Sequence, residues 1–287
     1  MPKPCERAVT AWIKILGAIM KRIILGIFLL FTSSVVANTL SEIRQSGAIR
    51  VGVFEAQPPF SKFEDGKFEG FEVTLAEALS KDIFGTKSGK VEFVPVKASE
   101  RLRVLEENKV DMVLATFTIT NERKQVVDFT TPYFAVNIGV LTRTGDRIKT
   151  VSDLHGKPII AESGTTGEAY FRKEGFDVIN CATANECYKM LKENKGIGYA
   201  TDNLLVLAYA VIDSDTEVNI KNLGPSEFLG VAVQKGNKEL LDFLNGELIK
   251  LSKEGFMKKT YNETIEPYYK GTAEKKYFLL DDLYSLF

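Results

Sequence analysis

The 287-residue chain carries 37 Lys and Arg side chains against 38 Asp and Glu, which gives a net charge of −1 at pH 7. Both signs are dispersed along the chain, so nothing indicates a nucleic-acid surface. His155 is the one histidine, which leaves no second imidazole for a zinc site or a Ser-His-Asp or Cys-His set. It precedes Gly156 at the predicted end of a short helix, a place that suits a cation. We expect no metal, no cofactor and no nucleic-acid partner.

The first 37 residues read as an export signal. Two apolar runs, 11–20 and 23–31, are split by Lys21 and Arg22, and neither reaches the ~18 residues that span a bilayer. From Met20 the chain has a basic start, about ten apolar residues and a small-residue site ending at Ala37. We expect cleavage after Ala37, with Met20 as an alternative start of translation. An uncleaved membrane anchor is the alternative.

From residue 39 onward, predicted helices and strands alternate. The first helix has Thr39 and Glu42 at the spacing of a capping box. Helices are predicted at 39–47, 73–84, 99–109, 165–175, 185–196, 202–212 and 238–255. Strands are predicted at 48–54, 90–96, 110–116, 157–163, 176–182, 197–201 and 228–236, with a hairpin at 63–71. This rhythm predicts parallel α/β sheets.

Polar side chains follow three of the predicted strands, where open α/β sheets bind ligands. They are Thr116 and Thr118, the segment 163–166, and Asp202, and each leads into a helix N-terminus, which suits an anion. Taken singly, these are ordinary N-cap residues. Arg123 adds a planar fork that matches a carboxylate, and Asp202 suits an ammonium. Together they indicate an amino-acid site.

Four stretches resemble motifs of one known family: GFEVTLAEAL at 70–79, ATFTITNERKQVVDFTTPY at 115–133, ESGTTGEAYF at 162–171 and ATDN at 200–203. The family is the periplasmic solute-binding proteins of polar amino-acid ABC transporters, solute-binding family 3. The resemblance covers nearly all of residues 40–265 and is greatest to the cysteine-binding branch.

The resemblance implies a two-lobed, type II periplasmic binding protein of the α/β class. Each lobe would be a mostly parallel sheet flanked by helices, and two hinge strands, 137–143 and 228–234, would join the lobes. Lobe 1 would hold residues 38–140 and 228–287, and lobe 2 would hold 141–227. The implied function is that of a monomeric periplasmic receptor, not an enzyme. It would deliver a polar amino acid to the permease of an ABC importer in the inner membrane.

The resemblance also implies roles for single residues. Arg123 and Thr118 would bind the α-carboxylate, Thr165 and Thr166 would add donors from the second lobe, and Asp202 would pair with the ammonium. Ala115 and Thr116 would line the same strand end, with the carbonyl of one of them helping to hold the ammonium. The expected side-chain pocket consists of Phe54, Glu55, Gln57, Phe60, Phe71, Phe117 and Glu162.

The expected ligand has a small, neutral side chain. Phe54 stands where relatives that bind basic amino acids tend to place an acid, and a buried cation without a counter-charge is very costly. No Lys or Arg falls in the pocket segments to serve an acidic ligand beside Arg123. Gln57 offers an amide. We expect L-cysteine first and glutamine or another neutral polar amino acid second.

Cys181 and Cys187 form a candidate disulfide. Thr183 and Glu186 have the spacing of a capped helix start, which would place Cys187 in the first turn and near Cys181. Export to an oxidising compartment allows a bridge. A pair of free, partly buried thiols is equally compatible with the sequence.

Two other function classes are considered. The family has periplasmic dehydratase relatives, and such an enzyme would need a general acid facing the ligand, for which Glu55 or Glu162 is available. A surface adhesin could use the aromatic tail at 268–287.

Overall fold

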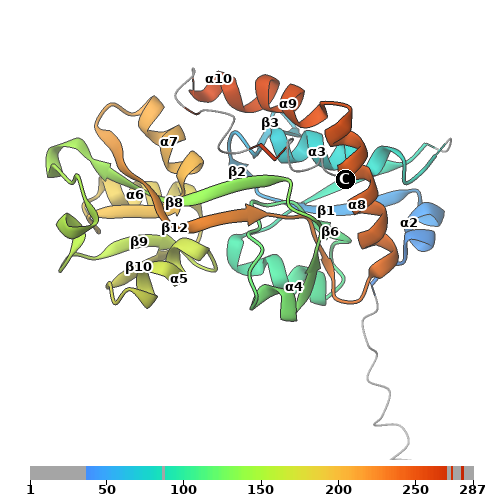
Figure 1. Cartoon of the computed structure of the whole chain (residues 1–287), viewed down its shortest axis with the longest axis horizontal. Helices are drawn as coiled ribbons and strands as arrows, with labels where there is room; N and C mark the ends of the chain where they lie inside the picture. Colours follow the sequence, from blue (N-terminus) through green and yellow to red (C-terminus); the bar gives the residue numbers. More distant parts are fainter. Residues whose placement is uncertain (1–36, 86–87, 270–272, 274–278, 281–287) are drawn as a thin grey trace, which may run out of the picture. The chain divides into compact units, whose positions relative to one another are not determined.

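The computed structural model describes residues 37–85, 88–269, 273 and 279–280 (Figure 1). The predicted export signal lies outside the described residues except for Ala37, and the tail at 268–287 is described only at 268–269, 273 and 279–280. In the described part, no helix combines the length and apolarity that crossing a membrane requires.

The first lobe is built on a five-stranded sheet of order β5-β1-β6-β13-β7. Strand β1 runs parallel to β5 and β6, whereas β13 runs antiparallel to β6 and β7. The strands are β1 (Ala48–Val53), β5 (Lys90–Pro95), β6 (Met112–Val113), β7 (Val127–Phe129) and β13 (Ala232–Gln234). A small antiparallel sheet adds β2 (Ala56–Gln57), β3 (Ser61–Glu64) and β4 (Lys67–Glu69). The α-helices are α2 (Leu40–Ser46), α3 (Phe71–Lys81), α4 (Arg101–Glu106), α8 (Lys238–Lys253), α9 (Phe256–Thr260) and α10 (Glu266–Tyr269).

The second lobe repeats this plan with a sheet of order β10-β9-β11-β8-β12. Strand β9 runs parallel to β10 and β11, and β8 runs antiparallel to β11 and β12. The strands are β8 (Phe134–Arg143), β9 (Ile159–Glu162), β10 (Val178–Cys181), β11 (Gly198–Asp202) and β12 (Thr216–Leu229). The helices are α5 (Thr166–Lys173), α6 (Ala184–Lys192) and α7 (Asn203–Ile212).

Short helices occur in both lobes. The 3-10 helices are η1 (Ala98–Glu100), η2 (Arg123–Gln125), η3 (Thr144–Asp146) and η4 (Val151–Leu154), and η5 (Tyr261–Ile265) is a π-helix. The predicted α/β class and two-lobed fold are confirmed. Each sheet is mixed because its fourth strand, β13 or β8, runs antiparallel to both of its neighbours.

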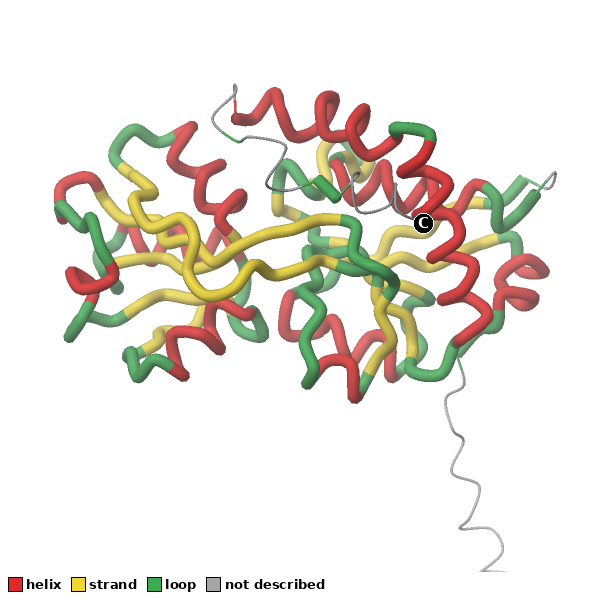
Figure 2. Tube along the Cα trace, in the orientation of Figure 1, coloured by secondary structure: helices red, strands yellow, loops and turns green. Residues whose placement is uncertain are grey.

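Strands β8 and β12 connect the two sheets and lie side by side in Figure 2. They pair from Arg143 opposite Thr216 to Phe134 opposite Leu229, with three register shifts that interrupt the ladder. After Leu229 the chain continues into β13 of the first sheet. The prediction from the sequence missed most of β12, because a Gly-Pro pair at 224–225 interrupts the residue pattern typical of a strand. The exact lobe boundaries, 38–140 plus 228–287 and 141–227, stay a prediction.

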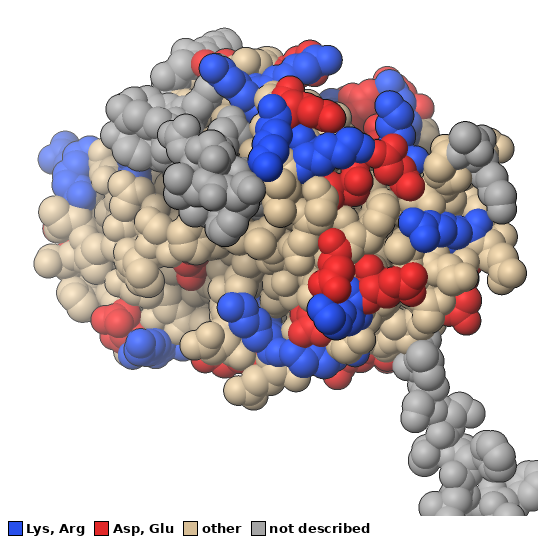
Figure 3. All heavy atoms as spheres, turned by 45° about the vertical axis from the view of Figure 1, so that its right-hand side comes forward, with Lys and Arg blue, Asp and Glu red and all other residues tan. Residues whose placement is uncertain are grey.

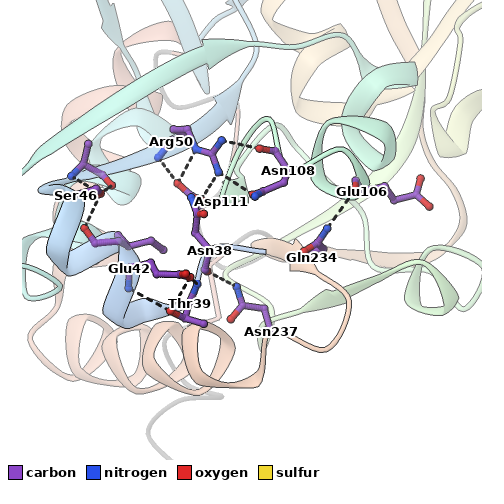
Figure 4. A network of polar contacts seen from close by, with 12 residues as sticks. Asn38, Thr39, Glu42, Ser46, Arg50, Glu106, Asn108, Asp111, Gln234 and Asn237 are labelled. Carbon is purple, nitrogen blue, oxygen red and sulfur yellow. Dashed lines mark hydrogen bonds and ion pairs between the residues drawn. The ribbon is translucent and has the colours of Figure 1, made fainter. Parts of the chain in front are cut away.

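The chain is anchored from Asn38 onward. The Asn38 side chain donates to Asp111 at 3.0 Å, and its carbonyl accepts from Asn237 at 3.0 Å (Figure 4). Asp111 also pairs with Arg50 at 2.6 Å. Thr39 then caps α2 in the predicted capping box. Asn38, at which the sequence predicts the mature chain to begin, is therefore bonded to residues of the first lobe.

Charges of both signs are interspersed on the face shown in Figure 3. Many ion pairs of the described residues join exposed side chains, and such pairs contribute little to stability. In this view basic and acidic side chains therefore lie next to each other.

Candidate ligand-binding site

Thr116 follows β6 and has a left-handed backbone with a φ of 39°. This region is strained for a β-branched side chain, at a cost of about 1–3 kcal/mol. Glu72 of α3 holds the strained residue, because its carboxylate accepts from the Thr116 N–H at 2.6 Å. Glu72 also accepts from the Tyr133 hydroxyl. Helix α3 thus fixes the strand end at which the sequence predicts ligand binding.

Arg123 begins η2 and turns its guanidinium back over that strand end. Its Nη1 donates to the Thr118 carbonyl at 2.7 Å, and its Cζ lies 4.8 Å from the centre of the Phe117 ring. Its Nη2 donates at 2.9 Å to the carbonyl of Gly164, in the loop after β9 of the second lobe. Arg123 therefore contacts both lobes.

Arg101, at the start of α4, is a second guanidinium at this strand end, and the sequence analysis missed it. It is 2% exposed. Its nitrogens donate to the carbonyls of Ala98 (2.9 Å), Ala115 (2.9 Å), Thr116 (3.0 Å) and Gly164 (2.9 Å). The Ala115 and Thr116 carbonyls, which were expected to help with a ligand ammonium, here accept from Arg101. Gly164 accepts from both arginines.

The two arginines share the Phe117 ring, with Cζ of Arg101 at 4.5 Å from its centre. Burial, together with the charge of Arg123, lowers the pKa of Arg101 to about 9, so the group stays charged at pH 7. The expectation that no second cation lies near Arg123 was therefore wrong. Four of the five N–H groups of Arg101 donate to protein carbonyls. Arg101 therefore offers a ligand its positive charge more than free hydrogen-bond donors. The sequence spacing could have indicated its burial. Val104 and Leu105, three and four residues after Arg101, lie on the same helix face and are buried in the core.

The loop after β9 brings Thr165 and Thr166 to the predicted start of α5. The Thr165 hydroxyl donates to the Glu162 carbonyl at 2.7 Å and accepts from the Glu168 N–H at 3.2 Å. The Thr166 hydroxyl donates to the Glu227 carboxylate at 2.6 Å. Both hydroxyls therefore have protein partners in this structure.

Asp202 ends β11 and stands at the N-cap of α7 without capping the helix with its side chain. It is 7% exposed. Burial and then the charge of Glu227 raise its pKa to about 7, against the opposing charges of Arg101 and Arg123. The carboxyl thus lies within electrostatic reach of both guanidinium groups, and a ligand ammonium beside it would favour the ionised form.

Phe54, Gln57 and Glu162 line a cavity of about 440 Å³ between the lobes. Burial raises the pKa of Glu162 to about 7. Glu55, also expected in the pocket, lines the same cavity. The lining further includes residues outside the predicted site: Ala56, Pro95, Val96, Lys97, Glu100, Thr183, Ala184 and Asn185. These additions include one base, Lys97, and one acid, Glu100, so they leave the balance of charge in the cavity unchanged.

Phe60 and Phe71 do not line this cavity. Each packs against Phe134 with ring centres 5.4 Å apart, in the core of the first lobe, and neither is exposed. Main-chain bonds fix both, since the Phe71 N–H donates to the Pro59 carbonyl and the Glu72 N–H to the Phe60 carbonyl. The turn before the hairpin thus directs both rings into the core.

Cys181 and Cys187 form a disulfide in this structure, with their Cα atoms 5.3 Å apart. The bridge joins the end of β10 to α6. It encloses the segment 183–185, whose residues line the cavity. The bridge is therefore close to the cavity.

His155 stacks on Phe176 with ring centres 5.0 Å apart, next to the short helix η4. Among the described residues, no group of three or more His, Cys, Asp or Glu side chains could hold a metal ion.

Comparison with known proteins identifies the family. Residues 49–266 match the model of the bacterial extracellular solute-binding proteins, family 3. The chain is 32% identical over 221 residues to the L-cystine-binding protein TcyJ of Escherichia coli K12, with 75% of this chain and 82% of that protein covered. It is 29% identical to the glutamine-binding protein GlnH of Bacillus subtilis, over 80% of this chain and 85% of that one.

A solved structure agrees with these matches. The L-cysteine solute receptor of Neisseria gonorrhoeae superposes with a TM-score of 0.81 at 38% identity, over 84% of this chain and 99% of the receptor. The chain belongs to family 3 of the bacterial extracellular solute-binding proteins.

Proposed function

We propose that the cleft binds a neutral polar L-amino acid, L-cysteine first and L-glutamine second, for delivery to the permease of an ABC importer. The observation that carries this proposal is that the Arg123 guanidinium lies over the segment after β6 in the first lobe, whereas Asp202 ends β11 in the second lobe. A guanidinium matches the α-carboxylate and a buried carboxylate matches the α-ammonium. One amino acid would then connect the two lobes.

Closure of the lobes would complete the site. Arg101 and Arg123 already reach across to the Gly164 carbonyl, each at 2.9 Å. Ligand binding between the lobes would add further cross-lobe bonds to this contact. The hinge strands β8 and β12 provide the connection about which such closure would occur.

The choice of cysteine rests on the relatives and on the cavity. The receptor of Neisseria gonorrhoeae is named for L-cysteine, TcyJ for L-cystine and GlnH for glutamine. Phe54 and Gln57 offer an aromatic wall and an amide. Because Arg101 has most of its donors bound to carbonyls, it gives an acidic side chain little to bind. Glu162 disfavours such a ligand further when it is ionised.

The cavity acids also bear on the enzyme alternative. Glu162 has the raised pKa of a general acid, and Glu55 lines the same cavity. The family and the relatives described above are binding proteins. We infer binding without chemistry, and recovery of a bound amino acid unchanged after long incubation would support this inference.

We also infer export and a monomeric state in the periplasm. The signal pattern ending at Ala37 and the anchoring of Asn38 to Asp111 and Asn237 support cleavage after Ala37.

The test is calorimetric titration of two arginine variants with L-cysteine and L-glutamine. Arg123→Ala should abolish measurable binding, because truncating one member of a buried charge pair costs about 2–5 kcal/mol. The matched control is Arg103→Ala, because the Arg103 side chain is 56% exposed and pairs with Glu100 and Glu107 of its own lobe, whereas Arg123 reaches Gly164 of the second lobe. Equal binding by Arg123→Ala and wild type would place the site elsewhere.

A further inference from the structure

The C-terminal helices of the first lobe reach the second lobe. Helix α10 contacts α7, the helix that follows Asp202, and both lie at the upper side of Figure 1. Tyr269 ends α10 and is fully buried. It belongs to the hydrophobic cluster that contains Leu204 and Leu205 of α7. The family match ends at residue 266, so Tyr269 lies beyond it.

A specific hydrogen bond accompanies this packing. The Tyr269 hydroxyl donates to the Leu204 carbonyl at 2.6 Å. Leu204 is in the first turn of α7, two residues after Asp202. A buried tyrosine usually finds a partner for its hydroxyl. The partner here belongs to the helix turn that directly follows Asp202, the residue proposed to bind the ligand ammonium.

The opposite side of this turn rests on the hinge strand β8. The Asn203 side chain accepts from the Leu204 N–H at 2.9 Å and from the Asn137 N–H at 3.4 Å. Gly139 of β8 lies so close that a Cβ there would be 2.7 Å from Cγ2 of Val206. The start of α7 is thus held by β8 on one side and by Tyr269 on the other.

We propose that Tyr269 is a positioning residue for ligand binding, which holds the first turn of α7 so that Asp202 meets the ligand ammonium. The proposal rests on the proposed amino-acid site. No capping hydrogen bond to α7 holds the Asp202 side chain in place. Its place therefore depends on the backbone on which it stands, and the Tyr269 hydroxyl fixes that backbone from the first lobe.

The test is a double-mutant cycle by calorimetry with L-cysteine and L-glutamine. Tyr269→Phe keeps the ring and removes the hydroxyl, and we expect about threefold to tenfold weaker binding, the range of one lost hydrogen bond. Combined with Asp202→Asn, it should cause no further loss, because it acts through Asp202. Tyr261→Phe is the matched control. Its hydroxyl donates to the Ala273 carbonyl within the C-terminal segment and should leave affinity unchanged.

The outcomes separate the two proposals. If wild type binds neither amino acid, the proposed function fails whatever the variants do. If wild type binds and Tyr269→Phe binds equally well, only the role of Tyr269 is refuted. A loss of the same size in the Asp202→Asn background would also refute it. Thermal unfolding of both tyrosine variants shows whether stability alone changes, and equal loss of affinity by Tyr261→Phe would assign the effect to general destabilisation.

Discussion

Replacing Gly164 by alanine would place a methyl group between the lobes. Its Cβ would lie 2.8 Å from Cα and 3.0 Å from the main-chain nitrogen of Ser99 in the first lobe. Because both neighbours are backbone atoms, the lobes must separate. The bonds of Arg101 and Arg123 to the Gly164 carbonyl, each 2.9 Å, would then lengthen.

The magnitude follows from those two bonds. A hydrogen bond from a charged group contributes about 1.5–3 kcal/mol, so loss of one or both should weaken ligand binding by at least about tenfold. The backbone adds a separate effect on folding, because the φ of Gly164 is 82° and alanine there costs about 1–2 kcal/mol.

Gly156→Ala is the matched control for that strain. Gly156 has a φ of 74°, and no atom lies within 4 Å of the position of its Cβ. Both variants should lose similar stability in thermal unfolding, and only Gly164→Ala should lose affinity in calorimetric titration with L-cysteine and L-glutamine. Wild-type affinity in Gly164→Ala would refute the role of this contact in the ligand-bound state.

Three further predictions concern protons, the disulfide and export. Burial raises the pKa of Asp202 and Glu162 to about 7, so their share of the stability of the unliganded protein is present at low pH and is lost as pH rises toward 7 and beyond. Affinity should rise over the same interval, because the ligand ammonium needs ionised Asp202; in Asp202→Asn most of this rise should disappear, and a pH-independent wild-type affinity would contradict the assignment. Replacing Cys181 and Cys187 by serine should lower the free energy of unfolding by about 2 kcal/mol in denaturant titration, whereas an unchanged midpoint would show that the bridge contributes nothing. N-terminal sequencing of exported protein should begin at Asn38 or within a few residues, and an intact membrane-bound chain would contradict cleavage.

Local patterns predicted much of the fold. Thr39, Thr165 and Thr183 all cap the helices at which the sequence placed them. Strand ends were found because buried strands read as apolar runs that stop at polar residues. For this reason the sequence alone placed Arg123 and Asp202 near strand ends, and their role in ligand binding stays a prediction.

Features that depend on distant partners could not be read in this way. Arg101 sits in an ordinary charged helix, and its buried role comes from carbonyls up to 63 residues away. Phe60 is close to Phe54 in the sequence and was grouped with it for that reason, but the turn at Pro59 sends it into the core. Tyr269 gave no signal, because its partner at Leu204 is 65 residues earlier.

The measurement that tests the account most directly is a calorimetric competition series on the mature wild-type protein with L-cysteine, L-glutamine, L-arginine and L-lysine. The account predicts that L-cysteine binds most tightly and L-glutamine next. The preferred ligand at about 100 times its Kd should raise the free energy of unfolding by about 2.7 kcal/mol. Tighter binding of L-arginine or L-lysine than of both neutral amino acids would contradict the pocket assignment. Binding of none of the four would contradict the proposed function itself.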